Sequence, residues 1–135
     1  MLPPVVLLIH DDEMFRAACI EAVGDDYLVW TDDLDVGERL AAERSPDIVL
    51  VAERLQGSAR WGLHAVEGLA ATGATVIVVA TGEVSVACVL QAFDDGAFGY
   101  LDRSVPSHLP AMLGRAAADR ASLPATTDKR LTAAG

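Results

Sequence analysis

Two adjacent carboxylates, Asp11 and Asp12, come directly after an uninterrupted apolar run at residues 5–9. Such a run, closed by charge, is typical of a strand that helices cover on both faces of a parallel sheet. Open α/β sheets bind ligands outside the carboxyl ends of their strands, so we expect this acidic pair to open a site. Asp12 also stands where a helix N-cap would, and capping alone is the competing interpretation of the pair.

The rest of the chain alternates apolar strands with helical patterns. Strands connected through helices imply right-handed crossovers and a parallel sheet with helices on both faces, which is a three-layer α/β sandwich. At 135 residues the chain fits one domain with one hydrophobic centre. We predict strands at 5–9, 27–30, 48–52, 75–80 and 97–101, and helices at 13–23, 34–44, 62–71, 84–94 and 106–121.

The composition excludes several functions. A formal net charge of −10 argues against direct contact with nucleic acid, which needs clustered Lys and Arg. No apolar run is long enough to span a membrane, and the first residues carry no basic segment of a signal peptide, so we predict a cytoplasmic protein. No nucleophile–base arrangement or Gly-rich phosphate loop is present, and we predict no independent enzyme.

The predicted helix at 84–94 has almost no polar face, although a surface helix should show one. Its apolar side chains belong either to the core or to an interface with a partner, since exposed apolar patches mark such interfaces. Cys88 lies in this pattern and Cys19 in the first helix, and we predict that both are small buried hydrophobic residues rather than metal ligands. The interface interpretation assigns the partner contact to Val84, Ala87, Cys88 and Leu90.

Four landmarks appear in order: Asp11-Asp12-Glu13 after the first strand, then the segments at 46–51, 78–81 and 96–101. Together they resemble the receiver domain of two-component response regulators over roughly residues 5–120. The resemblance implies a flavodoxin-like (CheY-like) fold, with five parallel strands in order 2-1-3-4-5 and five helices. It also implies a receiver domain at 1–121 and a tail at 122–135.

Members of this family accept a phosphoryl group on an Asp at the end of the third strand. An acidic pair holds a divalent cation, and a hydroxyl residue and a Lys contact the phosphoryl oxygens, so that charge on the transferring group is neutralised. By position, Asp11 and Asp12 match the acidic pair and Thr81 the hydroxyl residue. Tyr100 matches the aromatic that changes rotamer on activation in the family.

Two positions depart from the family pattern. Ala52 stands where the phosphoacceptor Asp should be, and a methyl group cannot attack phosphorus. Its loss also leaves Asp11 and Asp12 as a poor magnesium set, so we expect no metal and no cofactor. Arg103 stands at the Lys position, where it either pairs with the two carboxylates in place of a metal or is a solvated charge.

Glu53 is the nearest carboxylate that could replace the phosphoacceptor. Because successive strand side chains point to opposite faces, Glu53 should face away from the pocket unless the following loop bends. That loop places Arg60 and Trp61 near the mouth of the pocket. Trp61 either serves as a lid or partner contact or packs on the third helix.

We therefore predict an atypical receiver that regulates transcription as a homodimer and without phosphorylation. Because the phosphoacceptor is missing, a cognate kinase is doubtful. Two alternatives are a pocket that binds a small molecule and a domain phosphorylated at Glu53. The segment Leu131-Thr132-Ala133 resembles the start of the helix-turn-helix module in NarL/FixJ, or LuxR-type, regulators. DNA would then be bound only by a downstream domain outside this chain, with 122–135 as the linker.

Overall fold

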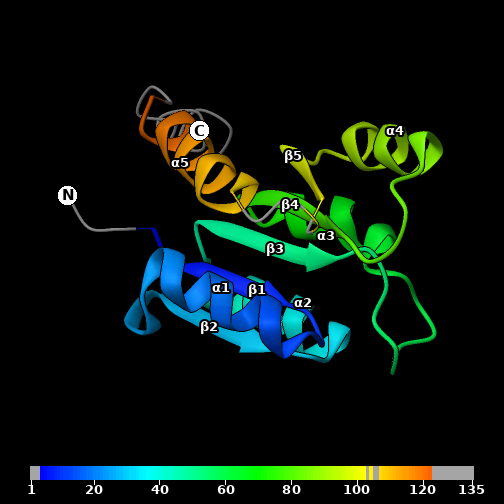
Figure 1. Ribbon diagram of the computed structural model, residues 1–135, viewed down its shortest axis with the longest axis horizontal. Helices are drawn as coiled ribbons and strands as arrows, with labels where there is room; N and C mark the ends of the chain where they lie inside the picture. The colour runs from blue at the N-terminus through cyan, green and yellow to red at the C-terminus, as the bar shows by residue number, and fades with distance from the viewer. Residues whose placement is uncertain (1–3, 103, 105–106, 123–135) are drawn as a thin grey trace, which may run out of the picture.

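The computed structural model describes residues 4–102, 104 and 107–122. It contains a five-stranded parallel sheet in the order β2-β1-β3-β4-β5, with helices on both sides (Figure 1), as the sequence predicts. The strands are β1 (Val6–Ile9), β2 (Leu28–Thr31), β3 (Ile48–Ala52), β4 (Thr75–Ala80) and β5 (Gly99–Asp102). The α-helices are α1 (Glu13–Val23), α2 (Leu34–Arg44), α3 (Val66–Ala71), α4 (Val86–Asp94) and α5 (His108–Ser122), with short 3-10 turns η1 (Asp25–Tyr27) and η2 (Gly62–Ala65).

The sheet separates two apolar layers. Strand side chains of alternating parity point to opposite faces, so each buried strand supplies both layers. Leu7, Ile9 and Val49 belong to the layer beneath α2 and α3. Leu8 and Leu50 belong to the layer beneath α1 and α5. Every residue of β1 and β3 is buried, which is why these strands read as unbroken apolar runs in the sequence.

The capping prediction for Asp12 is confirmed. Its Oδ1 accepts hydrogen bonds from the amides of Met14 at 2.9 Å and Phe15 at 3.2 Å, two donors that the first turn of α1 leaves unsatisfied. Gly24 ends the helix with φ of 88°, a conformation that costs glycine little. Helices α1 and α2 begin and end where the sequence predicts.

Other boundaries differ from the prediction. The helix expected at 62–71 begins as the 3-10 turn η2, and α4 begins at Val86 because Ser85 caps it through the Cys88 amide. The strands predicted at 27–30 and 97–101 are Leu28–Thr31 and Gly99–Asp102. Register with the neighbouring strand decides these ends: Phe98 is held by a backbone bond to Val76 before the β4–β5 ladder begins at Gly99.

One prediction about cysteine is wrong. Cys19 on α1 is fully buried, but Cys88 is only half-buried. Cys88 packs against the core cluster, while its helix α4 has Ala92 as its one buried residue. Within the described residues, none of the helices is both long and apolar enough to cross a membrane.

Candidate functional site

Residues that the sequence singled out gather at one edge of the sheet. Asp11, Ala52 and Thr81 lie at or just beyond the carboxyl ends of β1, β3 and β4, which are neighbours in the sheet. Asp12 and Glu53 come one residue further along, and we call these five residues the carboxyl-end site. Thr81 is half-buried in the turn after β4. Arg103, the sixth predicted residue, lies outside the described residues.

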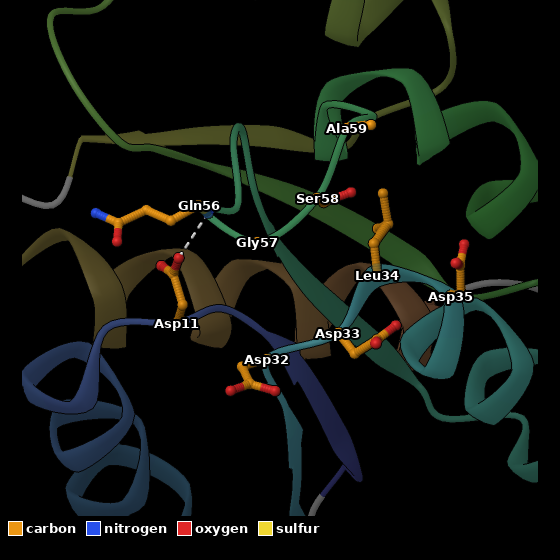
Figure 2. Close-up of a pocket in the computed structure, with 9 residues that line it drawn as sticks. All are labelled: Asp11, Asp32, Asp33, Leu34, Asp35, Gln56, Gly57, Ser58 and Ala59. Atoms are coloured by element: carbon orange, nitrogen blue, oxygen red, sulfur yellow. Dashed lines mark hydrogen bonds between the residues drawn. The ribbon is translucent and has the colours of Figure 1, made fainter.

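The two adjacent aspartates of this site each accept hydrogen bonds from backbone amides. Asp12 caps α1, as described above. Asp11 Oδ2 accepts the amide hydrogen of Gln56 at 2.8 Å, a bond that crosses from β1 to the loop after β3 (Figure 2). Charge-assisted bonds of this kind are the stronger class of protein hydrogen bonds. The protein itself therefore stabilises both carboxylates.

His10 adds a contact that sequence reasoning missed. It is 1% exposed at the end of β1, stacked on the ring of Phe15. Its Nδ1 accepts the Asp12 amide hydrogen at 3.1 Å and lies 3.4 Å from Asp11 Oδ1. An Nδ1 atom that accepts a hydrogen bond uses its lone pair and carries no proton. The approach of Nδ1 to Asp11 is therefore a contact and not an ion pair. Burial at the end of a central strand was the signal that could have found this residue.

The loop from Glu53 to Trp61 projects beyond the end of β3 and is tied to α2 (Figure 1). Arg60 NH2 pairs with Asp35 Oδ1 at 2.7 Å, and its guanidinium also binds the carboxylate of Glu38. The loop is thus held on one side by the Gln56–Asp11 bond and on the other by Arg60.

A cavity of about 440 Å³ lies between this loop and the start of α2. Figure 2 shows acidic side chains from two segments around it, with Asp11 pointing up toward the loop and Asp33 lying at the start of α2. Asp33 itself caps α2 by accepting the Val36 amide at 3.0 Å. The lining residues are Asp11, Asp32, Asp33, Leu34, Asp35, Gln56, Gly57, Ser58 and Ala59.

Ala52 is fully buried in the apolar layer beneath α2 and α3. The chain returns very close to it at Gly62, where a Cβ would lie 1.8 Å from the carbonyl oxygen of Ala52. The close approach requires glycine, and it packs the start of η2 against the end of β3. Ala52 is therefore enclosed by the protein's own backbone and not exposed at the bottom of an open pocket.

Trp61 packs against the core cluster rather than standing free over the site. It is half-buried, stacks on His64 with ring centroids 6.1 Å apart, and carries the Arg54 guanidinium 4.6 Å from its ring centre. Of its two predicted roles, these contacts match packing at the third helix.

Glu53 is 6% exposed, and its carboxylate accepts a hydrogen bond from the hydroxyl of Tyr100 on β5. Burial raises the pKa of Tyr100 above its ordinary value, and the neighbouring Glu53 raises it further. The sequence named both residues but gave no reason to join them, because they are 47 positions apart. Only the order of β3, β4 and β5 in the sheet brings them together.

The described residues contain no group of three His, Cys, Asp or Glu side chains that could hold a metal ion. Asp11, Asp12 and Glu53 are all within the described part of the chain. The third carboxylate that a magnesium site would need beside the acidic pair is therefore not supplied by Glu53 in this conformation.

The helix α4 presents apolar side chains to solvent. Val84 just before it is 45% exposed, and Val86 is 75%, Leu90 64% and Phe93 47% exposed. Together with the exposed Ala87 we call these residues the α4 surface. Val84, Ala87 and Leu90 were predicted for this surface, whereas Val86 and Phe93 were missed. Cys88 was predicted with them, but it is half-buried and packs against the core cluster. A groove of about 490 Å³ adjoins this surface, and its lining residues include Val84, Val89, Phe93, Tyr100, Met112 and Arg115.

Comparison with solved structures identifies the fold. The receiver domain of the response regulator NarL from Mycobacterium tuberculosis is 22% identical over 86% of this chain and 98% of that one, with a TM-score of 0.70. A LuxR-family two-component response regulator from Aurantimonas is 24% identical over 84% of this chain and 86% of that one, with a TM-score of 0.67. The fold is that of a receiver domain.

NtrX from Brucella abortus has the same fold, with 19% identity over 85% of this chain and a TM-score of 0.73. The chain spans 27% of the length of NtrX. No family model and no curated protein matches the sequence. At such identities the agreement concerns the backbone arrangement, and the roles of individual residues rest on the geometry described above.

Proposed function

We propose that this chain is an atypical response-regulator receiver domain that takes no phosphoryl group and signals as a homodimer through its α4 surface. The observation that carries the proposal is Ala52, a buried methyl group at the end of β3 in a receiver fold. Phosphoryl transfer to a receiver forms a bond between a carboxylate oxygen and phosphorus. Ala52 offers no such oxygen.

The state of the acidic pair supports the same conclusion. A magnesium ion in a phosphoryl-transfer site needs carboxylates that are open to it, usually with waters completing an octahedron. Asp12 caps α1 and Asp11 binds the Gln56 amide, so both carboxylates already have donors from the chain. We therefore propose that the site works without magnesium or any other cofactor.

Glu53 is a poor substitute for the missing nucleophile. Its carboxylate is buried and engaged by Tyr100. Phosphorylation there would have to break this bond and bring a dianionic group into an apolar layer, which costs several kcal/mol without compensating partners.

The α4 surface supports dimerisation. Two copies of a protein with a formal charge of −10 repel each other, and the repulsion is smallest where their surfaces carry no charge. Residues 84–93 contain no Asp, Glu, Lys or Arg. Exposed apolar patches of this kind usually mark protein–protein contacts.

Transcription regulation is the biological role that we propose. The neighbours in fold include a NarL receiver and a LuxR-family regulator. The segment Leu131-Thr132-Ala133 lies outside the described residues, and its resemblance to the start of a helix-turn-helix module supports a DNA-binding partner domain. DNA would be bound by that domain, since the net charge of this chain disfavours contact with phosphates.

A phosphorylation assay tests the first part of the proposal. The chain is incubated with a small phosphodonor and magnesium, and its intact mass is measured beside a receiver that carries an aspartate at the end of β3. We expect added phosphoryl mass on the control alone. Phosphorylation of this chain would overturn the proposal, and peptide mapping would then decide whether Glu53 carries the group.

Sedimentation at several concentrations tests the dimer. We expect the average mass to rise with concentration, and Leu90→Lys to weaken association by about tenfold or more, since it introduces a charge into an apolar contact. Met14→Lys is the matched control because Met14, 84% exposed on α1, lies outside the α4 surface. A strictly monomeric chain, or equal effects of the two substitutions, would refute this part.

A further inference from the structure

Glu53 is a buried carboxylate that directly follows the wholly apolar strand β3. Burying a charged group is costly unless it is hydrogen-bonded, and Tyr100 provides the donor. The bond replaces part of the hydration that Glu53 loses. Its presence therefore constrains where the Tyr100 ring can lie.

The backbone on both sides of this bond is fixed. The Glu53 amide donates to Val79 of β4 at 2.8 Å, and the Glu53 carbonyl accepts from Leu63 of η2 at 3.2 Å. Tyr100 is paired with Val78 in the β4–β5 ladder. The side-chain bond consequently bridges β4 and joins the end of β3 to β5.

The helix α4 is attached to the rest of the protein by few buried groups. Ala92 is its one fully buried residue, and Cys88 and Val89 are half-buried. An element with so little buried apolar surface opens at low free-energy cost. Tyr100 and Cys88 of α4 pack against the same core cluster, and Tyr100 lines the groove beside α4 together with Val84 and Val89. A shift of the Tyr100 ring would therefore change the packing beneath α4.

We propose that the Glu53–Tyr100 hydrogen bond is a built-in conformational restraint that holds α4 and the α4 surface in a single arrangement without phosphorylation. The inference rests on the proposed function, because it assigns the control of the proposed dimer surface to a permanent bond within the chain. Glu53 and Tyr100 act as positioning residues and contact no ligand.

Amide hydrogen exchange on the full chain tests this restraint. Tyr100→Phe leaves the Glu53 carboxylate without the Tyr100 donor, and hydrogen bonds to charged groups are worth about 1.5–3 kcal/mol. We expect exchange in α4 and β5 to accelerate about tenfold or more, while β1 and β3 stay protected. Tyr27→Phe, which removes the other tyrosine hydroxyl of the chain, is the matched control and should change nothing in α4.

A second variant separates the bond from general loss of stability. Glu53→Leu removes the carboxylate and replaces it with an apolar side chain of similar size. The double variant Glu53→Leu/Tyr100→Phe should loosen α4 no more than either single variant, since all three lack the same bond. Additive effects, uniform acceleration across the sheet, or unchanged exchange in Tyr100→Phe would overturn the restraint.

The outcome is distinguishable from failure of the dimer proposal. If sedimentation finds only monomers but exchange accelerates in α4, the restraint stands and the α4 surface is not a self-association site. If dimers form and exchange is unchanged, the dimer proposal stands and the restraint is refuted.

Discussion

The carboxyl-end site and the α4 surface are built on opposite principles. At the carboxyl-end site, polar groups are paired within the chain: Asp11 with the loop, Asp12 with the first turn of α1, and Glu53 with β5. On the α4 surface, apolar groups such as Val86 and Leu90 are left in water. The first region is satisfied without a ligand, while the second exposes side chains that a partner would cover.

We therefore expect binding partners at the α4 surface rather than at the carboxyl-end site. A phosphorylation site must keep an accessible nucleophile and an open cation position, and both cost stability in the unoccupied state. Here the end of β3 is closed by backbone packing at Gly62 and by the side chain of Ala52. Most of the large apolar side chains that are exposed in the described part of the chain belong to the α4 surface, next to β5 at the edge of the sheet.

The largest expected effect concerns the closure at Gly62. Gly62→Ala would place a methyl group 1.8 Å from the Ala52 carbonyl oxygen, so η2 must move away from β3. We expect a loss of about 3 kcal/mol in the free energy of unfolding, at the upper end of overpacking costs. Gly68→Ala, where the added methyl meets open space in α3, should be neutral or stabilising in the same denaturant titration. Equal stability of the two variants would show that the site is not closed in this way.

Thiol labelling compares the two regions directly. Burial raises the pKa of Cys19 to about 12, while Cys88 is half-buried on α4. Because the thiolate is the reactive form and access limits the rate, we expect Cys88 to react on the order of 100-fold faster than Cys19. Mass spectrometry of labelled peptides measures both rates. Comparable rates for both thiols would contradict the picture of α4 as the accessible region.

Tyr100 forms a hydrogen bond with Glu53 of the carboxyl-end site and lines the groove beside the α4 surface. The pKa of Tyr100 therefore tests whether this hydrogen bond is present. Its pKa is raised by burial and by Glu53, so the phenol should ionise above its ordinary value near 10. A raised folded-state pKa means that the stability contributed by the protonated group is complete below the unfolded pKa and is lost as pH rises through the folded pKa. Difference absorbance between the wild type and Tyr100→Phe measures this ionisation. A phenol that titrates at its ordinary value would contradict the buried bond.

The smallest expected effect concerns the outer attachment of the loop. Arg60 is paired with Asp35 and Glu38 at the surface, where ion pairs contribute about 0.5 kcal/mol and are screened by salt. Arg60→Ala should therefore lower the unfolding free energy by about that amount, and less at high salt. A loss above about 2 kcal/mol would mean that the loop does more to close the carboxyl-end site than its exposed position indicates.

Most of the fold was predictable because burial on both faces leaves a clear mark. The runs at β1, β3 and β4 contain few polar residues. Aspartate caps mark the starts of α1 and α2, Gly24 marks the end of α1, and Ser45 before Pro46 marks the end of α2. Two predicted boundaries were wrong for different reasons. At α4, the Ser85 side chain caps the helix locally through the Cys88 amide, so the helix begins later than its apolar pattern indicates. At β5, the Phe98 amide donates to Val76 of the neighbouring strand before the strand begins at Gly99. The prediction that Cys88 is buried was wrong because the sequence of an almost wholly apolar helix does not show which of its sides packs against the core.

The sequence predicted where residues of the carboxyl-end site lie in the sheet, but not which groups they form hydrogen bonds with. The positions of Asp11, Ala52 and Thr81 after successive strands placed them at one edge of the sheet. The partners of Asp11 and Glu53 were not foreseen, because Gln56 and Tyr100 are 45 and 47 residues away in the chain. Alternation along a strand gives the direction of a side chain but not the group that it meets.

The order of residues alone determined the class of fold and the absence of a carboxylate at position 52, since periodicity and residue identity are local properties of the chain. Tertiary structure decided that Gly62 closes over Ala52, that Glu53 binds Tyr100 and that α4 turns its apolar side chains outward. These three features depend on distances between segments far apart in the sequence, and such distances arise only when the strands have paired and the helices have packed.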